Sequence, residues 1–229
     1  ERLRYTLDLA RLLVSLPGPK YRTISTVAGG FGPSTQAPAV RQTIAKNLIT
    51  TAQALAELAA ETGVFVRLCL EPEPWTTLET TDDVIAFWNE YLQAPEHIIS
   101  THLGICYDCC HQAVHFENPA ESIARLNEAG IHIGKIQVSS ALHLADPSNP
   151  AAREALQQFA EPRFLHQVVA QTESGLLKSL DLPHLKYVDE KWSSASAWRC
   201  HFHVPIWWTG SGHLSTTKDD WQAAITAAK

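Results

Sequence analysis

Carboxylates and imidazoles stand where several short β-rich runs of the sequence end. Glu71 closes one run and Asp108 closes the next, while His201 and His203 alternate along the last run. Oxygen and nitrogen ligands of this kind suit a hard or borderline divalent ion, which can polarise a substrate oxygen. The residue types therefore predict a divalent metal site, with zinc, manganese and magnesium as the candidate ions.

The spacing of the histidines leaves two interpretations open. His111 follows Asp108 by three residues, so the two side chains can serve one site or neighbouring sites. His201 and His203 share one face of a strand, which can direct both rings into one cavity. The alternative is a structural pair in which each ring is hydrogen-bonded within a core.

Polar and apolar side chains alternate along these runs. Because side chains alternate across a strand, odd and even positions separate two faces. Residues 64–71 place apolar side chains on one face and Arg67, Cys69 and Glu71 on the other. If the apolar faces meet helices, the polar faces line a barrel interior, and their last members meet at its carboxyl-terminal rim. The residues expected at that rim are Glu71, Asp108, Gln137 and His203. The alternative is a half-exposed sheet whose polar face meets solvent.

Helical and β-rich segments alternate along the chain. Pro38 and Gly63 bracket one amphipathic helix, while Asn118 and Asn149 each place a capping side chain before a proline. Further helices are expected over residues 2–16, 82–93 and 219–228, and strands over residues 23–28, 64–71, 102–108, 131–139 and 199–206. This order predicts a parallel sheet with helical crossovers, and hence an α/β fold of the (β/α)8 TIM-barrel type. We expect one domain over residues 1–229, with a hairpin-like insertion around residues 164–182.

Composition excludes several classes of protein. The 229 residues, 45% of them hydrophobic, suffice for one large domain with a buried core. Acidic residues outnumber basic ones by 24 to 18, and the net charge of -6 disfavours a nucleic-acid partner. No apolar stretch approaches the roughly 20 residues that a membrane span needs. The chain lacks methionine and begins within an expected helix, so we expect a fragment that is incomplete at both ends.

The cysteines indicate a cellular compartment. There are five of them, an odd count, and Cys109 and Cys110 are adjacent, so a complete disulfide framework is not expected. A reducing compartment, the cytoplasm, is therefore expected.

Large side chains near the last β-rich run are candidates for substrate contact. Arg199 lies on the polar face of that run, and Trp207 and Trp208 follow it. The tryptophans are expected to pack in the core or at the barrel mouth, and the alternative is an aromatic wall for a ring-shaped ligand. Arg199 and Trp207 are the expected substrate-binding residues of this segment.

Three motifs resemble those of the xylose-isomerase-like barrel superfamily, which includes sugar isomerases, epimerases and repair enzymes of the endonuclease IV type. They are Leu-Glu-Pro-Glu-Pro at residues 70–74, Gly-Ile-Cys-Tyr-Asp-Cys-Cys-His at residues 104–111 and Lys-Ile-Gln-Val-Ser-Ser at residues 135–140. Four further segments look more closely like the EboE-type metabolite-traffic proteins, namely residues 2–16, 23–33, 164–170 and 201–206. The resemblance covers nearly the whole chain.

The resemblance implies a set of metal ligands. Glu71 and Asp108 match the first two ligands of the superfamily, and Gln137 stands where its histidine is expected, offering an amide oxygen. His201 and His203 resemble an Asp-x-His element of the repair enzymes, with histidine in place of aspartate. The last glutamate of the superfamily has no counterpart, which implies that a final strand is missing.

The resemblance also implies two catalytic residues. His111 matches a histidine that contacts substrate or a second metal in several members, and Glu71 is a candidate base. The first hypothesis is therefore a metal-dependent sugar or sugar-phosphate isomerase or epimerase, in which the ion stabilises an enediolate while a carboxylate removes a proton.

Two alternatives accompany that hypothesis. One is a metabolite-binding or traffic protein of the EboE type without turnover, which Gln137 favours. The other, an endonuclease IV-like metal hydrolase, is disfavoured by the net charge and the changed ligand element. The expected partner is a small-molecule metabolite, with no nucleic acid and no membrane span. The sequence leaves the identity of the metal, the substrate and the oligomeric state undetermined.

Overall fold

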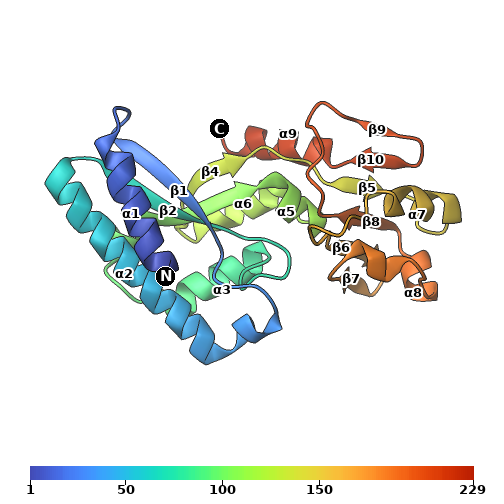
Figure 1. The fold of residues 1–229 in the computed structure, drawn as a ribbon, viewed down its shortest axis with the longest axis horizontal. Helices are drawn as coiled ribbons and strands as arrows, with labels where there is room; N and C mark the ends of the chain where they lie inside the picture. Colours follow the sequence, from blue (N-terminus) through green and yellow to red (C-terminus); the bar gives the residue numbers. More distant parts are fainter. The chain divides into compact units, whose positions relative to one another are not determined.

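The chain folds into two compact units in the computed structural model, which describes residues 1–229 (Figure 1). The first unit comprises Glu1–Tyr107 and Ala124–Ile136, and the second comprises Asp108–Ile123 and Gln137–Lys229. Each unit has its own sheet and its own buried side chains, so each is described by itself.

A four-stranded sheet organises the first unit. Its strands are β1 (Tyr21–Val27), β2 (Phe65–Glu71), β3 (Leu103–Asp108) and β4 (Ile133–Gln137), in that spatial order. β1 pairs in parallel with β2, and β2 pairs in parallel with β3. The helices that precede or connect the strands are α1 (Arg2–Ser15), α2 (Pro38–Thr62), α3 (Thr81–Tyr91), α4 (Glu96–His102), α5 (Cys109–Val114) and α6 (Pro119–Glu128), with a 3-10 turn, η1, at Pro33–Gln36.

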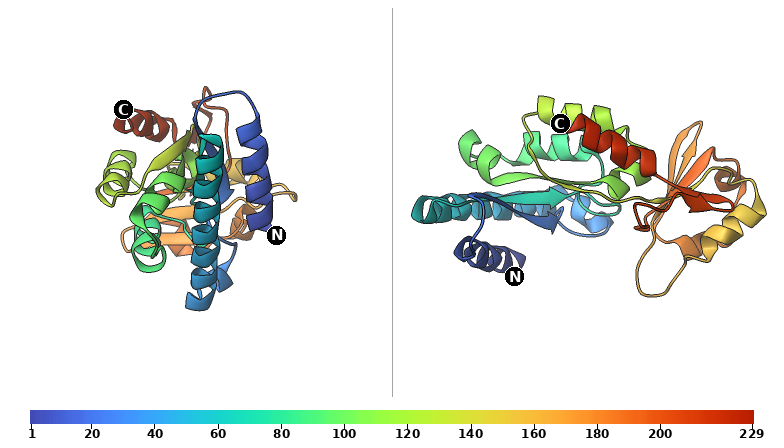
Figure 2. Two further views of the ribbon diagram at one scale, coloured as in Figure 1. Left: turned by 90° about the vertical axis from the view of Figure 1, so that its left-hand side faces the viewer. Right: turned by 90° about the horizontal axis from the view of Figure 1, so that it is seen from above.

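Local sequence signals set the ends of the main helix of this unit. Pro38 occupies the first turn of α2, where its missing N–H has no helical partner to lose, and Gly63 ends the helix with a left-handed φ of 69°. The residues buried on α2 recur at helical spacing and include Ala45, Leu48 and Ala52. α2 packs against α1 and against β2, and Figure 2 shows α1 and α2 running side by side.

The alternation along β2 separates two faces as expected. Val66, Leu68 and Leu70 are almost fully buried, each at most 3% exposed. On the opposite parity, the Arg67 guanidinium donates to the carbonyls of Ser100 and Thr101 at 2.8 and 3.1 Å. One face of the strand therefore supplies apolar packing, and the other holds hydrogen-bonded polar groups.

Gly104 in β3 allows a neighbouring segment to approach closely. A Cβ atom at this position would lie 2.7 Å from the carbonyl oxygen of His132 and 2.7 Å from Cδ of Arg67. Because one of these atoms belongs to the backbone, Gly104→Ala should force a backbone shift and lower the free energy of unfolding by about 1–3 kcal/mol. Urea unfolding followed by circular dichroism measures the effect, and an unchanged midpoint would contradict the contact.

A six-stranded antiparallel sheet organises the second unit, in the order β7-β6-β8-β5-β10-β9. The strands are β5 (Leu142–Leu144), β6 (Val168–Thr172), β7 (Gly175–Ser179), β8 (Ala197–Cys200), β9 (Gly210–Ser211) and β10 (Leu214–Thr216). Besides α5, its helices include α7 (Pro150–Gln157), η2 (Leu182–Leu185), α8 (Glu190–Ser193) and α9 (Lys218–Ala227).

Trp198 lies at the centre of the core of this unit. Its side chain is 1% exposed, its Nε1 donates to the carbonyl of Trp192 at 2.9 Å, and the two indole rings meet edge to face. Around it pack side chains from β5, β6, α7 and η2, including Leu142, Leu156 and Leu182. The antiparallel sheet thus has a hydrophobic core of its own.

The prediction of a (β/α)8 TIM barrel is wrong. Strands that alternate with helices form a parallel sheet only as far as β4. All strand pairs formed after β4 are antiparallel. β6 and β7 are joined by Glu173 and Ser174 alone, and so short a connection can link only antiparallel neighbours. The hairpin around residues 164–182 is therefore part of this sheet. Of the predicted strand over residues 199–206, only the beginning lies in β8 (Ala197–Cys200). From His201 the chain belongs to no strand, although the His201 N–H still donates to the carbonyl of Gln167 at 2.8 Å.

No helix is both long enough and apolar enough to cross a membrane. The longest, α2, carries charged and polar side chains along its exposed face.

Candidate metal centre

The site in the second unit begins at the junction between β3 and α5. Asp108 is fully buried and caps α5: its Oδ1 accepts the backbone N–H groups of Cys110 at 2.8 Å and His111 at 3.1 Å. The same oxygen accepts the hydroxyl of Ser139 at 2.7 Å, and Oδ2 accepts the Gln137 amide at 2.7 Å. Four donors thus hold this carboxylate, and the cap fixes the position of His111 in the first turn of the helix.

Three imidazoles converge next to this carboxylate. His111 comes from α5, and His201 and His203 follow β8 in a segment that belongs to no strand. Nε2 of His203 lies 3.3 Å from Nε2 of His201 and 3.4 Å from Nε2 of His111. The ring planes are inclined to one another by 53–82°, so the rings meet edge to edge or edge to face and do not stack. We call His111, His201 and His203 the imidazole cluster.

The nitrogen separations match a shared ion better than direct hydrogen bonds. Zinc binds imidazole nitrogen at about 2.0–2.1 Å, and two such ligands at the tetrahedral angle stand about 3.3–3.4 Å apart. A hydrogen bond between two ring nitrogens would be shorter, roughly 2.7–3.2 Å. Nε2 of His203 also faces two nitrogens at once, whereas a single proton on it could satisfy only one of them.

Neighbouring groups orient the His201 ring and keep it neutral, as a metal ligand must be. Its Nδ1 lies 2.7 Å from Oε1 of Gln167, an acceptor, so the ring proton sits on Nδ1 and the Nε2 lone pair points into the cluster. Burial lowers the pKa of His201 well below its usual value, and the nearby His111 and His203 lower it further. The ring is therefore neutral, which metal coordination requires.

Within the second unit, two groups are candidates for a fourth ligand. The carboxylate of Asp108 lies within 4.8 Å of the ligand nitrogens of His111 and His203, and the thiol of Cys110 lies within 4.8 Å of those of His201 and His203. Burial, followed by the charge of Asp108, raises the pKa of the Cys110 thiol well above its usual value, so without an ion the sulfur stays protonated. His203 is exposed, which leaves one side of the cluster open to solvent.

Two further buried histidines, His115 and His166, lie near His201. His115 is 3% exposed, and burial lowers its pKa to about 3. Nδ1 of His166 lies 3.3 Å from the carbonyl oxygen of His201. With this lowered pKa the His115 ring is neutral near pH 7, so it adds no positive charge beside the cluster.

The predicted site residues divide into two sets. Asp108, Gln137, His111, His201 and His203 all belong to the second unit, and the hydrogen bonds and ring contacts above join them into one group. Glu71 ends β2 in the first unit, so it is not a member of the group described within the second unit.

Arg199 and Trp207, two of the three predicted substrate-binding residues, have different surroundings in the second unit. The Arg199 guanidinium is engaged with Asp220 at 3.1 Å and with the carbonyl of Ala113 at 2.7 Å. Trp207 is 76% exposed in the turn after His203.

Sequence reasoning missed two residues that support the cluster. Ser139 has the same strand parity as Gln137, so the sequence could have placed it on the face where it donates to Asp108. No feature of the sequence indicated Gln167, because it reaches His201 only through the pairing of β6 with β8.

Comparison with known proteins gives no family for this arrangement. No protein-family model matches the chain, and no curated protein matches it.

Proposed function

We propose that the protein binds one divalent metal ion, zinc in preference to manganese or magnesium, at His111, His201 and His203. The observation that carries the proposal is the pair of Nε2 separations of 3.3 and 3.4 Å, which fit tetrahedral coordination. Imidazole ligands favour a borderline ion over the hard ions, which prefer oxygen. Asp108 and Cys110 flank the cluster as candidates for the fourth position.

The open side of the cluster favours a role beyond structural support. Structural zinc sites are closed by four protein ligands, whereas catalytic sites keep a position for water or substrate. Because His203 is exposed, a small molecule can approach the ion from solvent. We therefore propose a small oxygen-bearing metabolite, such as a sugar or sugar phosphate, as the partner, and the ion would polarise its carbonyl or hydroxyl oxygen.

Two outcomes are consistent with such a site: metal-dependent isomerisation or epimerisation, and metabolite binding without turnover. Proton abstraction needs a base, and within the second unit both oxygens of Asp108 already accept hydrogen bonds. This observation supports binding without turnover as the second candidate. Exchange of substrate C–H protons with deuterium from D2O, measured by NMR with a panel of aldoses and ketoses, distinguishes the two.

Metal binding itself is tested by loading. Protein stripped with EDTA, incubated with Zn²⁺ and freed of excess metal should retain about one zinc per chain by elemental analysis. His203→Ala and His111→Ala should each weaken zinc binding by at least about 100-fold, since each removes one ligand of three. Cobalt in place of zinc should give the visible absorption of a tetrahedral ion.

A matched control comes from the same unit. His184 is exposed and outside the cluster, so His184→Ala should bind zinc like the wild type. Failure of the wild type to retain any divalent ion, or equal retention by His203→Ala and the wild type, would remove the metal proposal.

The cytoplasm is the proposed location. All five cysteines are free and buried, which suits a compartment that keeps thiols reduced.

A further inference from the structure

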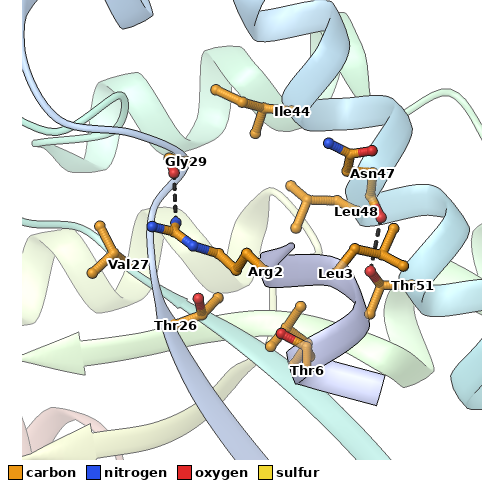
Figure 3. A pocket seen from close by; sticks show the side chains of 11 residues that line it. Arg2, Leu3, Thr6, Thr26, Val27, Gly29, Ile44, Asn47, Leu48 and Thr51 are labelled. Atoms are coloured by element: carbon orange, nitrogen blue, oxygen red, sulfur yellow. Dashed lines mark hydrogen bonds between the residues drawn. The ribbon is translucent and has the colours of Figure 1, made fainter. Parts of the chain in front are cut away.

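The first unit contains a cavity that is lined by residues of that unit alone. It has a volume of about 180 Å³ and opens between α1, α2 and the strands β1 and β2 (Figure 3). Arg2 and Thr6 reach it from α1, Thr26 from β1, and Leu48 from α2. All of these residues belong to one compact unit, so the shape of the cavity does not depend on the second.

The cavity carries a positive charge without an acidic partner. Arg2 donates one hydrogen bond to the carbonyl of Gly29 at 2.6 Å, which holds the guanidinium at the cavity wall, as Figure 3 shows. Arg2 makes no ion pair, and none of the lining residues is acidic. A guanidinium has five N–H donors, so donors remain for an anion after the bond to Gly29.

Three threonines and an asparagine place polar groups in the cavity wall. Thr6 is 5% exposed and Thr26 is half-buried. The hydroxyl of Thr51 is already engaged, because it donates to the carbonyl of Asn47 at 2.8 Å. The hydroxyls of Thr6 and Thr26 and the side-chain amide of Asn47 are therefore the neutral groups of the wall that can bond to a polar ligand.

Leucine side chains supply much of the rest of the wall, and the cavity is small. Leu3, Leu48 and Leu68 line it, and the last two are at most 8% exposed. A cavity of about 150 Å³ accommodates a molecule the size of benzene, so this one has room for roughly six to eight non-hydrogen atoms. One charged group, a few neutral hydrogen-bonding groups and an apolar wall on α2 and β2 together fit a short amphiphilic anion.

We infer that this cavity binds a small monocarboxylate of about four to six carbons, with the carboxylate on Arg2 and the chain against the leucines. Thr6 and Thr26 donate to the carboxylate or to a hydroxyl on the chain. The site is independent of the proposed metal centre, because it needs no residue of the second unit.

The inference is tested by NMR titration of the 229-residue chain with sodium butyrate, and with 1-butanol as the uncharged match. Butyrate should bind saturably with a Kd of about 1 mM and shift amide resonances of α1, α2 and β1. 1-Butanol should bind at least about 10-fold more weakly, because it lacks the charge that Arg2 recognises. Sodium chloride at equal concentration corrects for ionic strength.

Variants assign the binding to the cavity. Arg2→Gln should lower butyrate affinity at least about 10-fold, to the level of 1-butanol. Arg4→Gln is the matched control, since Arg4 lies on the same helix with 89% of its side chain exposed and should bind like the wild type. Thr6→Leu should fill the cavity and abolish binding of both probes.

Three results would overturn the inference. They are the absence of saturable butyrate binding to the wild type, equal affinity for butyrate and 1-butanol, and equal losses in the Arg2→Gln and Arg4→Gln variants. The first would mean that the cavity holds only water.

Discussion

Replacing Arg199 by methionine is expected to lower the free energy of unfolding of the protein by about 3–5 kcal/mol. The Arg199 guanidinium ion-pairs with Asp220 at 3.1 Å, donates to the carbonyl of Ala113 at 2.7 Å and stacks over Phe116 with 4.5 Å to the ring centroid. It therefore connects β8 to α9 and to the end of α5. Methionine keeps much of the apolar stem but removes the charge and both polar contacts.

The loss of stability in Arg199→Met is large because Asp220 remains largely buried without its partner. Burial raises the pKa of Asp220 and lowers that of Arg199, and in each case the opposite charge counters only part of the effect. Desolvation of each group therefore outweighs the attraction between them, so the loss of one leaves a poorly solvated charge on the other.

A double-mutant cycle measures this coupling. Arg199→Met/Asp220→Asn should recover most of the stability, because neither charge then remains. Urea unfolding followed by circular dichroism gives the free energies, and Arg163→Met, at an exposed position, is the control. If Arg199→Met unfolds within about 0.5 kcal/mol of the control, the pair has no such role.

Acid is expected to destabilise the metal-free protein steeply, and His115 is a principal cause. Burial, the charge of Lys178 and the nearby His111 lower the pKa of His115 to about 3 in the folded state. An unfolded histidine titrates near about 6.5, so the unfolded chain binds the proton more tightly. The contribution of this neutral ring to stability is therefore complete above about pH 6.5 and is lost as the pH falls toward 3. At pH 4.5 the loss amounts to about 3 kcal/mol.

His115→Gln should flatten this dependence. The variant carries no titrating group at the position, so its free energy of unfolding should fall less between pH 7.5 and 4.5 than that of the wild type, by about 3 kcal/mol. EDTA in every sample removes the contribution of bound metal. His184→Gln, at an exposed position of the same unit, should keep the slope of the wild type. Parallel slopes for the wild type and His115→Gln would show that this ring is not held neutral by burial.

Local structure follows from the sequence wherever neighbouring residues determine it. The helix bracketed by Pro38 and Gly63 forms as Pro38–Thr62, and the strand expected over residues 64–71 forms as Phe65–Glu71. Asn118 accepts the amide hydrogens of Ala120 and Glu121 at the start of α6, as an N-cap should. These outcomes depend on contacts within a few residues, which the sequence displays directly.

The sheet arrangement could not be predicted in the same way. The alternation of strands and helices as far as β4 is typical of a parallel sheet, and extending it to the end of the chain gave the wrong barrel. Short strands such as β5 and β10, of three residues each, carry too few side chains for their partners to be read from periodicity. Leu142 and Leu144 of β5 and Leu214 of β10 belong to the same core as Trp198, a grouping that only the folded chain displays.

The candidate site shows the same division. The residue types, the three-residue spacing of Asp108 and His111, and the common parity of His201 and His203 can all be read from the sequence. The contacts of His111 with His203, of Gln167 with His201 and of Arg199 with Asp220 can be read only from the folded chain. These pairs are separated by 92, 34 and 21 residues, and contacts across such separations form only when the whole core closes around them.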